Sequence, residues 1–218
     1  LDHIYRDTGL INPFHITAVL SRPASAASRF ASGLLLGAAA LLLGAWVDPV
    51  LAANSACPST LNHTFPRLQD EKPVSLCEQA GKVLLVVNTA SYCGYTGQYE
   101  ELEKLQQQYS SKGFSVVGFP SNDFGGQEPK SNKQIAEFCA NTFGVKFPMM
   151  AKSSVRGSSA NPLYKQLAKA TGQEPAWNFH KYLIDRHGKV IGAYPSGVSP
   201  LSNQLTSAIR SALEAPTR

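Results

Sequence analysis

An apolar run at residues 83–87 is the feature that most limits the folds open to this chain. Its sequence, Val-Leu-Leu-Val-Val, contains no polar side chain and is rich in β-branched residues. A run without polar alternation predicts a strand that is buried on both faces of a sheet. Residues 114–119, Phe-Ser-Val-Val-Gly-Phe, predict a second strand of this kind. We therefore expect a sheet that is covered on both sides.

Helical patterns lie between and after these strands. Apolar residues recur at spacings of three and four from Tyr99 to Tyr109, and Ser131 can cap a helix that carries Ile135, Phe138 and Cys139. Residues 182–184 and 190–191 flank a short polar turn, which predicts a hairpin. Ser199-Pro200 is expected to open a last helix, with an apolar stripe at Leu201, Leu205, Ile209 and Ala212. This order predicts an α/β fold with a central mixed sheet flanked by helices.

The N-terminal quarter of the chain has the pattern of a targeting segment. Residues 31–47 form an uncharged apolar run that follows Arg22 and Arg29 and precedes small residues near Ala52. The pattern is typical of a secretory signal. We expect residues 1–52 to be a signal segment, residues 53–218 to be one domain, and the protein to be exported, in the periplasm. Two alternatives stay open: residues 31–47 can remain as a membrane anchor, or Cys57 can carry a lipid.

Charge and cysteine spacing exclude two classes of function. The net charge of +5 is not gathered in any Lys/Arg block or basic-aromatic pattern, so we expect no nucleic-acid partner. The four cysteines, Cys57, Cys77, Cys93 and Cys139, form no CxxC motif and no paired Cys/His spacing. We therefore expect no metal site.

Cys93 has the position of a reactive thiol. The strand that contains residues 83–87 ends at about Asn88, and the helix that contains Tyr99 begins near Thr96. Cys93 lies in the loop between them, where free N–H groups and the positive end of the helix dipole stabilise a thiolate. The alternative is that Cys93 is a small buried hydrophobic residue.

Three sequence blocks around this cysteine resemble one protein family. Residues 88–99, NTASYCGYTGQY, are similar to the active-site signature of the glutathione peroxidases, and residues 118–129 and 177–185 match two further blocks. The resemblance covers roughly residues 60–214. Carried over residue by residue, the catalytic set of the family falls on Cys93, Gln127, Trp177 and Asn178. The resemblance also implies a thioredoxin-like fold.

The chemistry of peroxide reduction fits these residue types. A sulfur nucleophile attacks one peroxide oxygen, while amide and indole N–H groups supply neutral donors that stabilise the thiolate and the leaving oxygen. The expected activity is that of a thiol peroxidase, an antioxidant enzyme of the response to oxidative stress. It reduces hydrogen peroxide and organic hydroperoxides through a cysteine sulfenic acid. No cofactor is expected.

The remaining cysteines are assigned to two further roles. Members of the family that use thioredoxin carry a resolving cysteine in the block of Cys139, so a redox-active disulfide with Cys93 is implied; the alternative is that Cys139 is only a core residue. In an exported protein, Cys57 and Cys77 are expected to form a structural disulfide. Ala193 stands where members that use glutathione have an arginine, and the segment from Pro148 to Trp177 is short. These departures favour a monomer that is reduced by a thioredoxin-like protein, and glutathione stays open as the other reductant.

Other departures from the family pattern affect single residues. Ser121 replaces a cysteine, Asp123 replaces a glutamine, and His180 stands where threonine or serine is usual. We expect His180 to be a surface residue rather than a proton shuttle. Two alternative functions remain: a thioredoxin-fold thiol-disulfide oxidoreductase, which the missing CxxC disfavours, and a redox-inert binding module on the same scaffold.

Overall fold

A mixed four-stranded sheet organises the chain in the computed structural model, which describes residues 57–128 and 130–216. Its strand order is β4-β3-β5-β6, with β3 at Val83–Thr89 and β4 at Phe114–Pro120 paired in parallel. β5 (Lys181–Ile184) runs antiparallel to β3, and β6 (Val190–Tyr194) runs antiparallel to β5. Every residue of β3, β4 and β5 is buried. For β3 and β4 this is the burial that their apolar runs predict.

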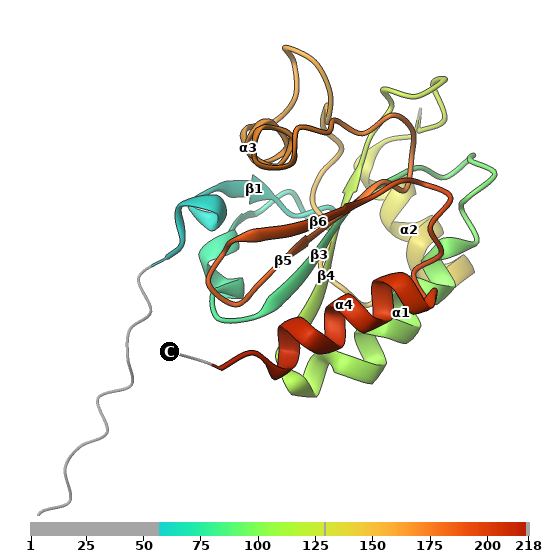
Figure 1. Ribbon diagram of the computed structural model, residues 1–218. Coiled ribbons are helices and arrows are strands. Elements are labelled where there is room, and N and C mark those ends of the chain that lie inside the picture. The colour runs from blue at the N-terminus through green and yellow to red at the C-terminus, as the bar shows by residue number, and fades with distance from the viewer. Residues whose placement is uncertain (1–56, 129, 217–218) are drawn as a thin grey trace, which may run out of the picture. The chain divides into compact units, whose positions relative to one another are not determined.

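Two cores lie on opposite faces of this sheet, because successive side chains of a strand point to opposite sides. Val83, Leu85 and Val87 pack in one core with residues of α1 (Gln98–Tyr109), α2 (Asn132–Phe143) and α4 (Asn203–Glu214). Leu84 and Val86 pack in the other core with α3 (Pro162–Thr171). Figure 1 shows α1 and α4 on one side of the sheet and α3 on the other. The predicted α/β class with a mixed sheet between helices is therefore confirmed.

A small hairpin sheet and a disulfide come before the central sheet in the described chain. β1 (Thr64–Pro66) pairs antiparallel with β2 (Pro73–Ser75). Short 3-10 helices at Ser59–Leu61 and Leu76–Gln79 flank this hairpin, and another, Ser110–Lys112, follows α1. Cys57 and Cys77 are joined in a disulfide that links these two segments. The pair is the one expected from the sequence, and the alternative of a lipid on Cys57 does not fit this bond.

The last helix begins later than the sequence predicts. Ser199 does not open it: the Ser199 hydroxyl donates a hydrogen bond to the carboxylate of Glu101 on α1, and its oxygen accepts from the backbone N–H of Leu201 in the turn before the helix. Ser202 caps the helix instead, accepting a hydrogen bond from the backbone of Leu205. Leu201 consequently falls outside the apolar stripe and is 40% exposed.

Nothing in the described part of the chain has the length and apolar character that a membrane-spanning helix needs. The proposed signal segment, its apolar run at residues 31–47 and the expected domain boundary after residue 52 lie outside the described residues.

Candidate active site

The loop between β3 and α1 holds Cys93 in a nearly buried position. Cys93 is 8% exposed, and the backbone N–H of Tyr95 points at its sulfur with N···S at 3.4 Å. Thr96 fixes the loop: its hydroxyl oxygen accepts from the Cys93 N–H at 3.0 Å and lies 3.0 Å from the Ala90 carbonyl oxygen. A backbone N–H directed at sulfur can hydrogen-bond an attacking sulfur, so the loop geometry suits a nucleophilic cysteine.

A second loop, after β4, is attached directly to the Cys93 loop. The backbone N–H of Tyr92 donates to the Gln127 carbonyl oxygen at 3.1 Å, and the Ser91 hydroxyl donates to Glu128 at 3.0 Å. Gln127 is thereby held beside the residue that precedes Cys93.

A third segment, residues 177–179, completes the site from the start of β5. The Asn178 side-chain amide donates to Gln127 Oε1 at 2.9 Å, so these two candidate residues touch each other. Asn88 at the end of β3 donates to the Trp177 carbonyl oxygen at 3.1 Å and accepts from the Phe179 N–H at 2.6 Å. Three loops that are distant in sequence therefore meet at one edge of the sheet, where β3 and β4 end and β5 begins.

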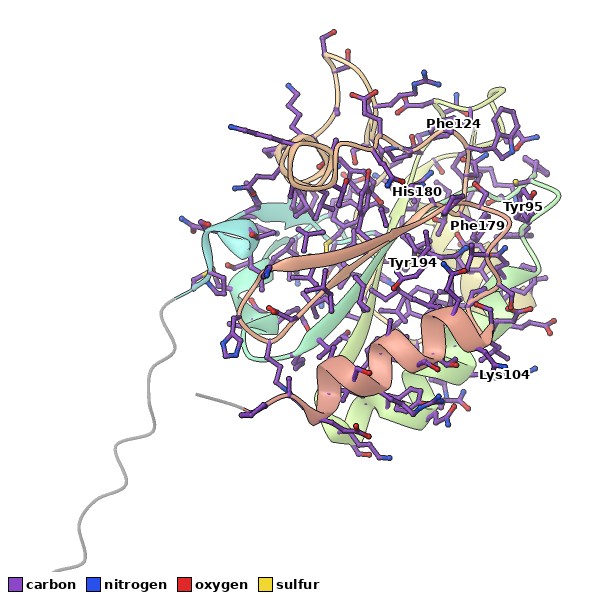
Figure 2. All side chains as sticks on the ribbon, viewed as in Figure 1. Tyr95, Lys104, Phe124, Phe179, His180 and Tyr194 are labelled. Atoms are coloured by element: carbon purple, nitrogen blue, oxygen red, sulfur yellow. A yellow bond between two sulfur atoms is a disulfide. The ribbon has the colours of Figure 1, made fainter. Side chains whose placement is uncertain are left out.

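Trp177 lies over the turn that carries Gln127. Its ring is 40% exposed, and its centroid lies 5.9 Å from that of Phe124. A Cβ added to Gly125 would touch the indole at 3.5 Å, so this turn packs closely on Trp177. Figure 2 shows Phe124, Phe179 and Tyr95 toward the end of the sheet at which β4 ends. Tyr92 and Tyr95 are 59% and 40% exposed, and with Trp177 they give the site an exposed aromatic rim.

Phe179 holds this third segment in a strained conformation. Its φ is +61°, in the left-handed region that a bulky residue rarely adopts, which costs of order 1–3 kcal/mol. Its buried ring packs edge-to-face on Tyr99 with centroids 5.3 Å apart. The packing offsets the strain, and the turn directs Asn178 toward Gln127.

Cys139 lies on α2 and is buried against the core. The capping box predicted at Ser131 is present, and Cys139 is 2% exposed, in the same core as Cys93. Burial raises the pKa of the Cys139 thiol to about 11. In this state the thiol is neutral at physiological pH.

His180 is not the surface residue that the sequence predicts. It is 3% exposed, and its ring lies 4.7 Å from that of Tyr182. Burial, with a smaller effect of Lys181, lowers the pKa of His180 to about 4. The imidazole is therefore neutral at physiological pH. The expectation failed because histidine is often exposed, whereas the position of His180 just before β5 buries it against the ring of Tyr182.

Lys181 is fully buried beside the site, and the sequence did not predict a structural role for it. Its ammonium donates to the Val198 carbonyl oxygen at 2.6 Å and to that of Ser196 at 3.4 Å, and Gln98 on α1 also donates to Ser196. Burial lowers the pKa of Lys181 to about 7. The hydrogen bonds of Lys181 and Gln98 thus hold the loop after β6 beside the N-terminus of α1. Its place directly before the apolar residues 182–184 was the sequence signal that could have predicted this burial.

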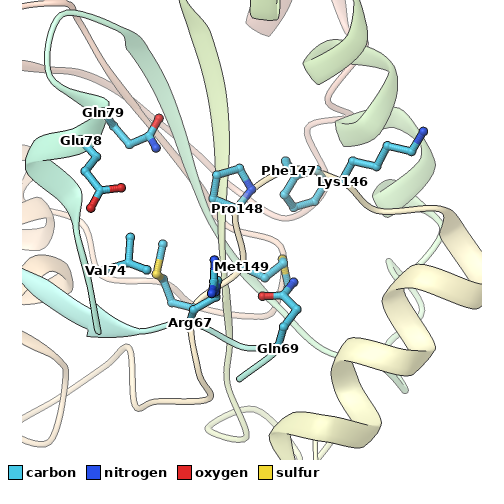
Figure 3. Close-up of a pocket in the computed structure, with 10 residues that line it drawn as sticks. Arg67, Gln69, Val74, Glu78, Gln79, Lys146, Phe147, Pro148 and Met149 are labelled. Atoms are coloured by element: carbon cyan, nitrogen blue, oxygen red, sulfur yellow. The ribbon is translucent and has the colours of Figure 1, made fainter. Parts of the chain in front are cut away.

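A hollow elsewhere on the molecule does not coincide with this site. It has a volume of about 440 Å³ and lies between the β1–β2 hairpin and the segment around Pro148 (Figure 3). None of the four candidate catalytic residues lines it. Among the described residues no group of three or more His, Cys, Asp or Glu side chains could hold a metal ion.

Comparisons with known proteins agree with this geometry. The family model described as glutathione peroxidase matches residues 61–168. A glutathione peroxidase-like peroxiredoxin of Schizosaccharomyces pombe is 45% identical over 150 residues, which are 66% of this chain and 95% of the relative. A hydroperoxy fatty acid reductase of Synechocystis sp. is 44% identical over 141 residues, 60% of this chain and 83% of the relative.

A solved structure supports the same grouping. The crystal structure of Trgpx in its apo form superposes with a TM-score of 0.59 at 36% identity, covering 73% of this chain and 98% of that chain. The expected thioredoxin-like fold is confirmed.

Proposed function

Since the chain belongs to the glutathione peroxidase family and is a thiol peroxidase, we propose that Cys93 is the sulfur that attacks the peroxide. The observation that carries this proposal is the meeting of Cys93, Gln127, Trp177 and Asn178 on three loops joined by hydrogen bonds. The Tyr95 N–H directed at the Cys93 sulfur supports the same assignment.

The proposed first step breaks the O–O bond. The Cys93 thiolate bonds to one oxygen and becomes a sulfenic acid, while the other oxygen takes a proton and leaves as water or an alcohol. Because Gln127 Oε1 accepts from Asn178, the Gln127 NH₂ group is turned away from that bond and can donate to the peroxide. The Trp177 N–H is the second proposed donor. Both donors are neutral, so neither traps the thiolate in an ion pair.

The proposed second step joins Cys93 to Cys139. The Cys139 sulfur attacks the sulfenic acid, a disulfide forms and water leaves. A disulfide requires Cα atoms within about 7 Å, so a Cys139 held in α2 reaches Cys93 only as that helix loosens. Asn141, Thr142 and Gly144 at the end of α2 are poor helix formers, which favours such loosening.

A thioredoxin-like protein is the proposed reductant of this disulfide. The substrates proposed are hydrogen peroxide and organic hydroperoxides, and the name of the Synechocystis relative supports the second class. The protein is proposed to act as a monomer, without nucleic acid, in the response to oxidative stress. Residues 31–47 support its export to the periplasm through a signal segment.

Two cysteine variants test these roles separately. Cys93→Ser should remove peroxide turnover with every reductant and leave the circular dichroism spectrum unchanged. Cys139→Ser should consume about one equivalent of peroxide per enzyme and then stop with thioredoxin as reductant.

Steady-state peroxide consumption with thioredoxin and with glutathione is the assay for both variants and for wild type. More than a few per cent of residual turnover by Cys93→Ser would refute the assignment of the nucleophile. Sustained turnover of Cys139→Ser with thioredoxin would refute the resolving role.

A further inference from the structure

One ammonium group lies against the rings of the two residues that precede the proposed redox cysteines. The Lys130 Nζ is 4.8 Å from the centroid of the Tyr92 ring and 4.2 Å from the centroid of the Phe138 ring. Both distances are within the roughly 6 Å at which a cation is attracted to an aromatic face. Tyr92 directly precedes Cys93, and Phe138 directly precedes Cys139 on α2. This contact of Lys130 with both rings, the Lys130 bridge, therefore joins the Cys93 loop to α2.

The main chain of Lys130 is itself held in place. The Lys152 ammonium donates to the Lys130 carbonyl oxygen at 2.6 Å and to the Glu128 carbonyl oxygen at 3.2 Å. The Lys152 backbone N–H donates to the side chain of Asn132 in the first turn of α2 at 2.9 Å. Asn132 in turn donates to Glu71 Oε1 at 2.8 Å. The bridge therefore starts from a fixed point beside the first turn of α2.

The bridge belongs to the packed form of α2 and is lost when the helix opens. Successive residues of an α-helix point about 100° apart, so Phe138 and Cys139 face different directions. Phe138 is half-buried and faces Lys130, whereas Cys139 is buried in the core. Unwinding that brings the Cys139 sulfur out to Cys93 moves the backbone of this turn and carries Phe138 off the ammonium.

We propose that Lys130 is a positioning residue that holds α2 closed beside the Cys93 loop and thereby sets how fast the resolving disulfide forms. The inference rests on the proposed roles of Cys93 and Cys139. While α2 is closed, the Cys93 sulfenic acid is open to a second peroxide molecule. Its sulfur then takes one oxygen and becomes a sulfinic acid, and the other oxygen leaves as water or an alcohol. Lys130 consequently also sets the sensitivity of the enzyme to excess peroxide.

Three variants separate this role from a general effect of charge. Lys130→Met keeps an apolar side chain of similar length and removes the cation. Lys130→Arg keeps a cation that stacks on aromatic rings and should restore the wild-type behaviour. Lys133→Met is the matched control, because it removes an exposed lysine from the first turn of the same helix.

The opening of α2 is measured first, by hydrogen–deuterium exchange of the full-length protein reduced at Cys93 and Cys139. Exchange in peptides that cover residues 135–143 should be about tenfold faster in Lys130→Met, because the closed helix loses its contact with the cation. Lys130→Arg and Lys133→Met should stay within about twofold of wild type. Wild-type exchange in Lys130→Met would show that the bridge does not hold the helix.

A single turnover with one equivalent of hydrogen peroxide measures the chemistry. Dimedone trapping gives the formation and lifetime of the Cys93 sulfenic acid, and peptide mass mapping gives its disulfide with Cys139. Lys130→Met should form the sulfenic acid at the wild-type rate and convert it to the disulfide about tenfold faster. At excess peroxide it should accumulate about tenfold less sulfinic acid per turnover. In a Phe138→Leu background the same substitution should change nothing further, because the bridge is already broken.

The sign of the effect decides the proposal. Slower disulfide formation in Lys130→Met would overturn it, since the charge would then help the Cys139 thiol to react instead of holding its helix. A wild-type rate, or an undiminished effect in the Phe138→Leu background, would overturn it as well. If wild type forms no Cys93–Cys139 disulfide, the second step of the proposed function fails and the control of its rate fails with it, even where exchange shows that Lys130 holds α2.

Discussion

The buried ammonium of Lys181 should make the stability of the protein depend on pH in a way that one substitution removes. Burial lowers the pKa of Lys181 from 10.5 to about 7 in the folded protein. Between these two values the unfolded chain binds more protons than the folded protein, so the free energy of unfolding rises with pH. At pH 7 this lysine opposes folding by about 4 kcal/mol and at pH 9 by about 2 kcal/mol, a difference of about 2 kcal/mol.

Lys181→Met keeps a side chain of similar length and removes the titrating group. Its free energy of unfolding should therefore gain about 2 kcal/mol less than that of wild type between pH 7 and pH 9. Other groups titrate in this range, but they are common to both proteins and cancel in the comparison.

Urea unfolding followed by circular dichroism at pH 7, 8 and 9 measures this difference. Lys165→Met is the control, because Lys165 is an exposed lysine of α3, and its curve should run parallel to wild type. Parallel curves for Lys181→Met and wild type would show that the Lys181 ammonium is not desolvated in the folded protein. The loop after β6 would then be held by something other than a buried cation.

Three other variants have outcomes that follow from the structure. Trp177→Phe keeps the ring contact with Phe124 and loses the N–H, so kcat/KM for peroxide should fall by about 10²-fold with an unchanged melting temperature; wild-type kinetics would make Trp177 a packing residue. Gly118→Ala would drive a Cβ into the Met149 sulfur in the middle of β4, so urea unfolding should report a loss of about 1–3 kcal/mol, and a neutral effect would contradict this packing. Replacing Cys57 and Cys77 together with alanine should cost about 3 kcal/mol in the same assay, while a stability equal to wild type would show that the bond constrains nothing.

The parts of the fold that could be predicted are those that local sequence determines. The apolar run at residues 83–87 predicts a strand that is buried on both faces, and the structure has this strand. The Ser131 cap also acts over a few residues and was predictable. α3 was not predicted as a helix, although Asn161 caps it and Pro162 occupies its first turn. That signal was local as well.

The parts that could not be predicted depend on contacts between distant segments. Ser199, the residue expected to open α4, is instead hydrogen bonded to Glu101, which is 98 residues away in the chain. The bond from Asn178 to Gln127 spans 51 residues, so the sequence could name these two residues only through a resemblance. The burial of His180 follows from packing that no local pattern records.

Two of the hydrogen bonds that join the loops of the site run from main chain to main chain. The Tyr92 N–H contacts the Gln127 carbonyl, and the Phe179 N–H contacts the Asn88 carbonyl; neither bond uses an atom of the four candidate catalytic side chains. A substitution at Cys93, Gln127 or Trp177 therefore leaves both main-chain hydrogen bonds available. The side chains of the site can therefore be replaced, by mutation or by design, while these bonds continue to hold the loops together.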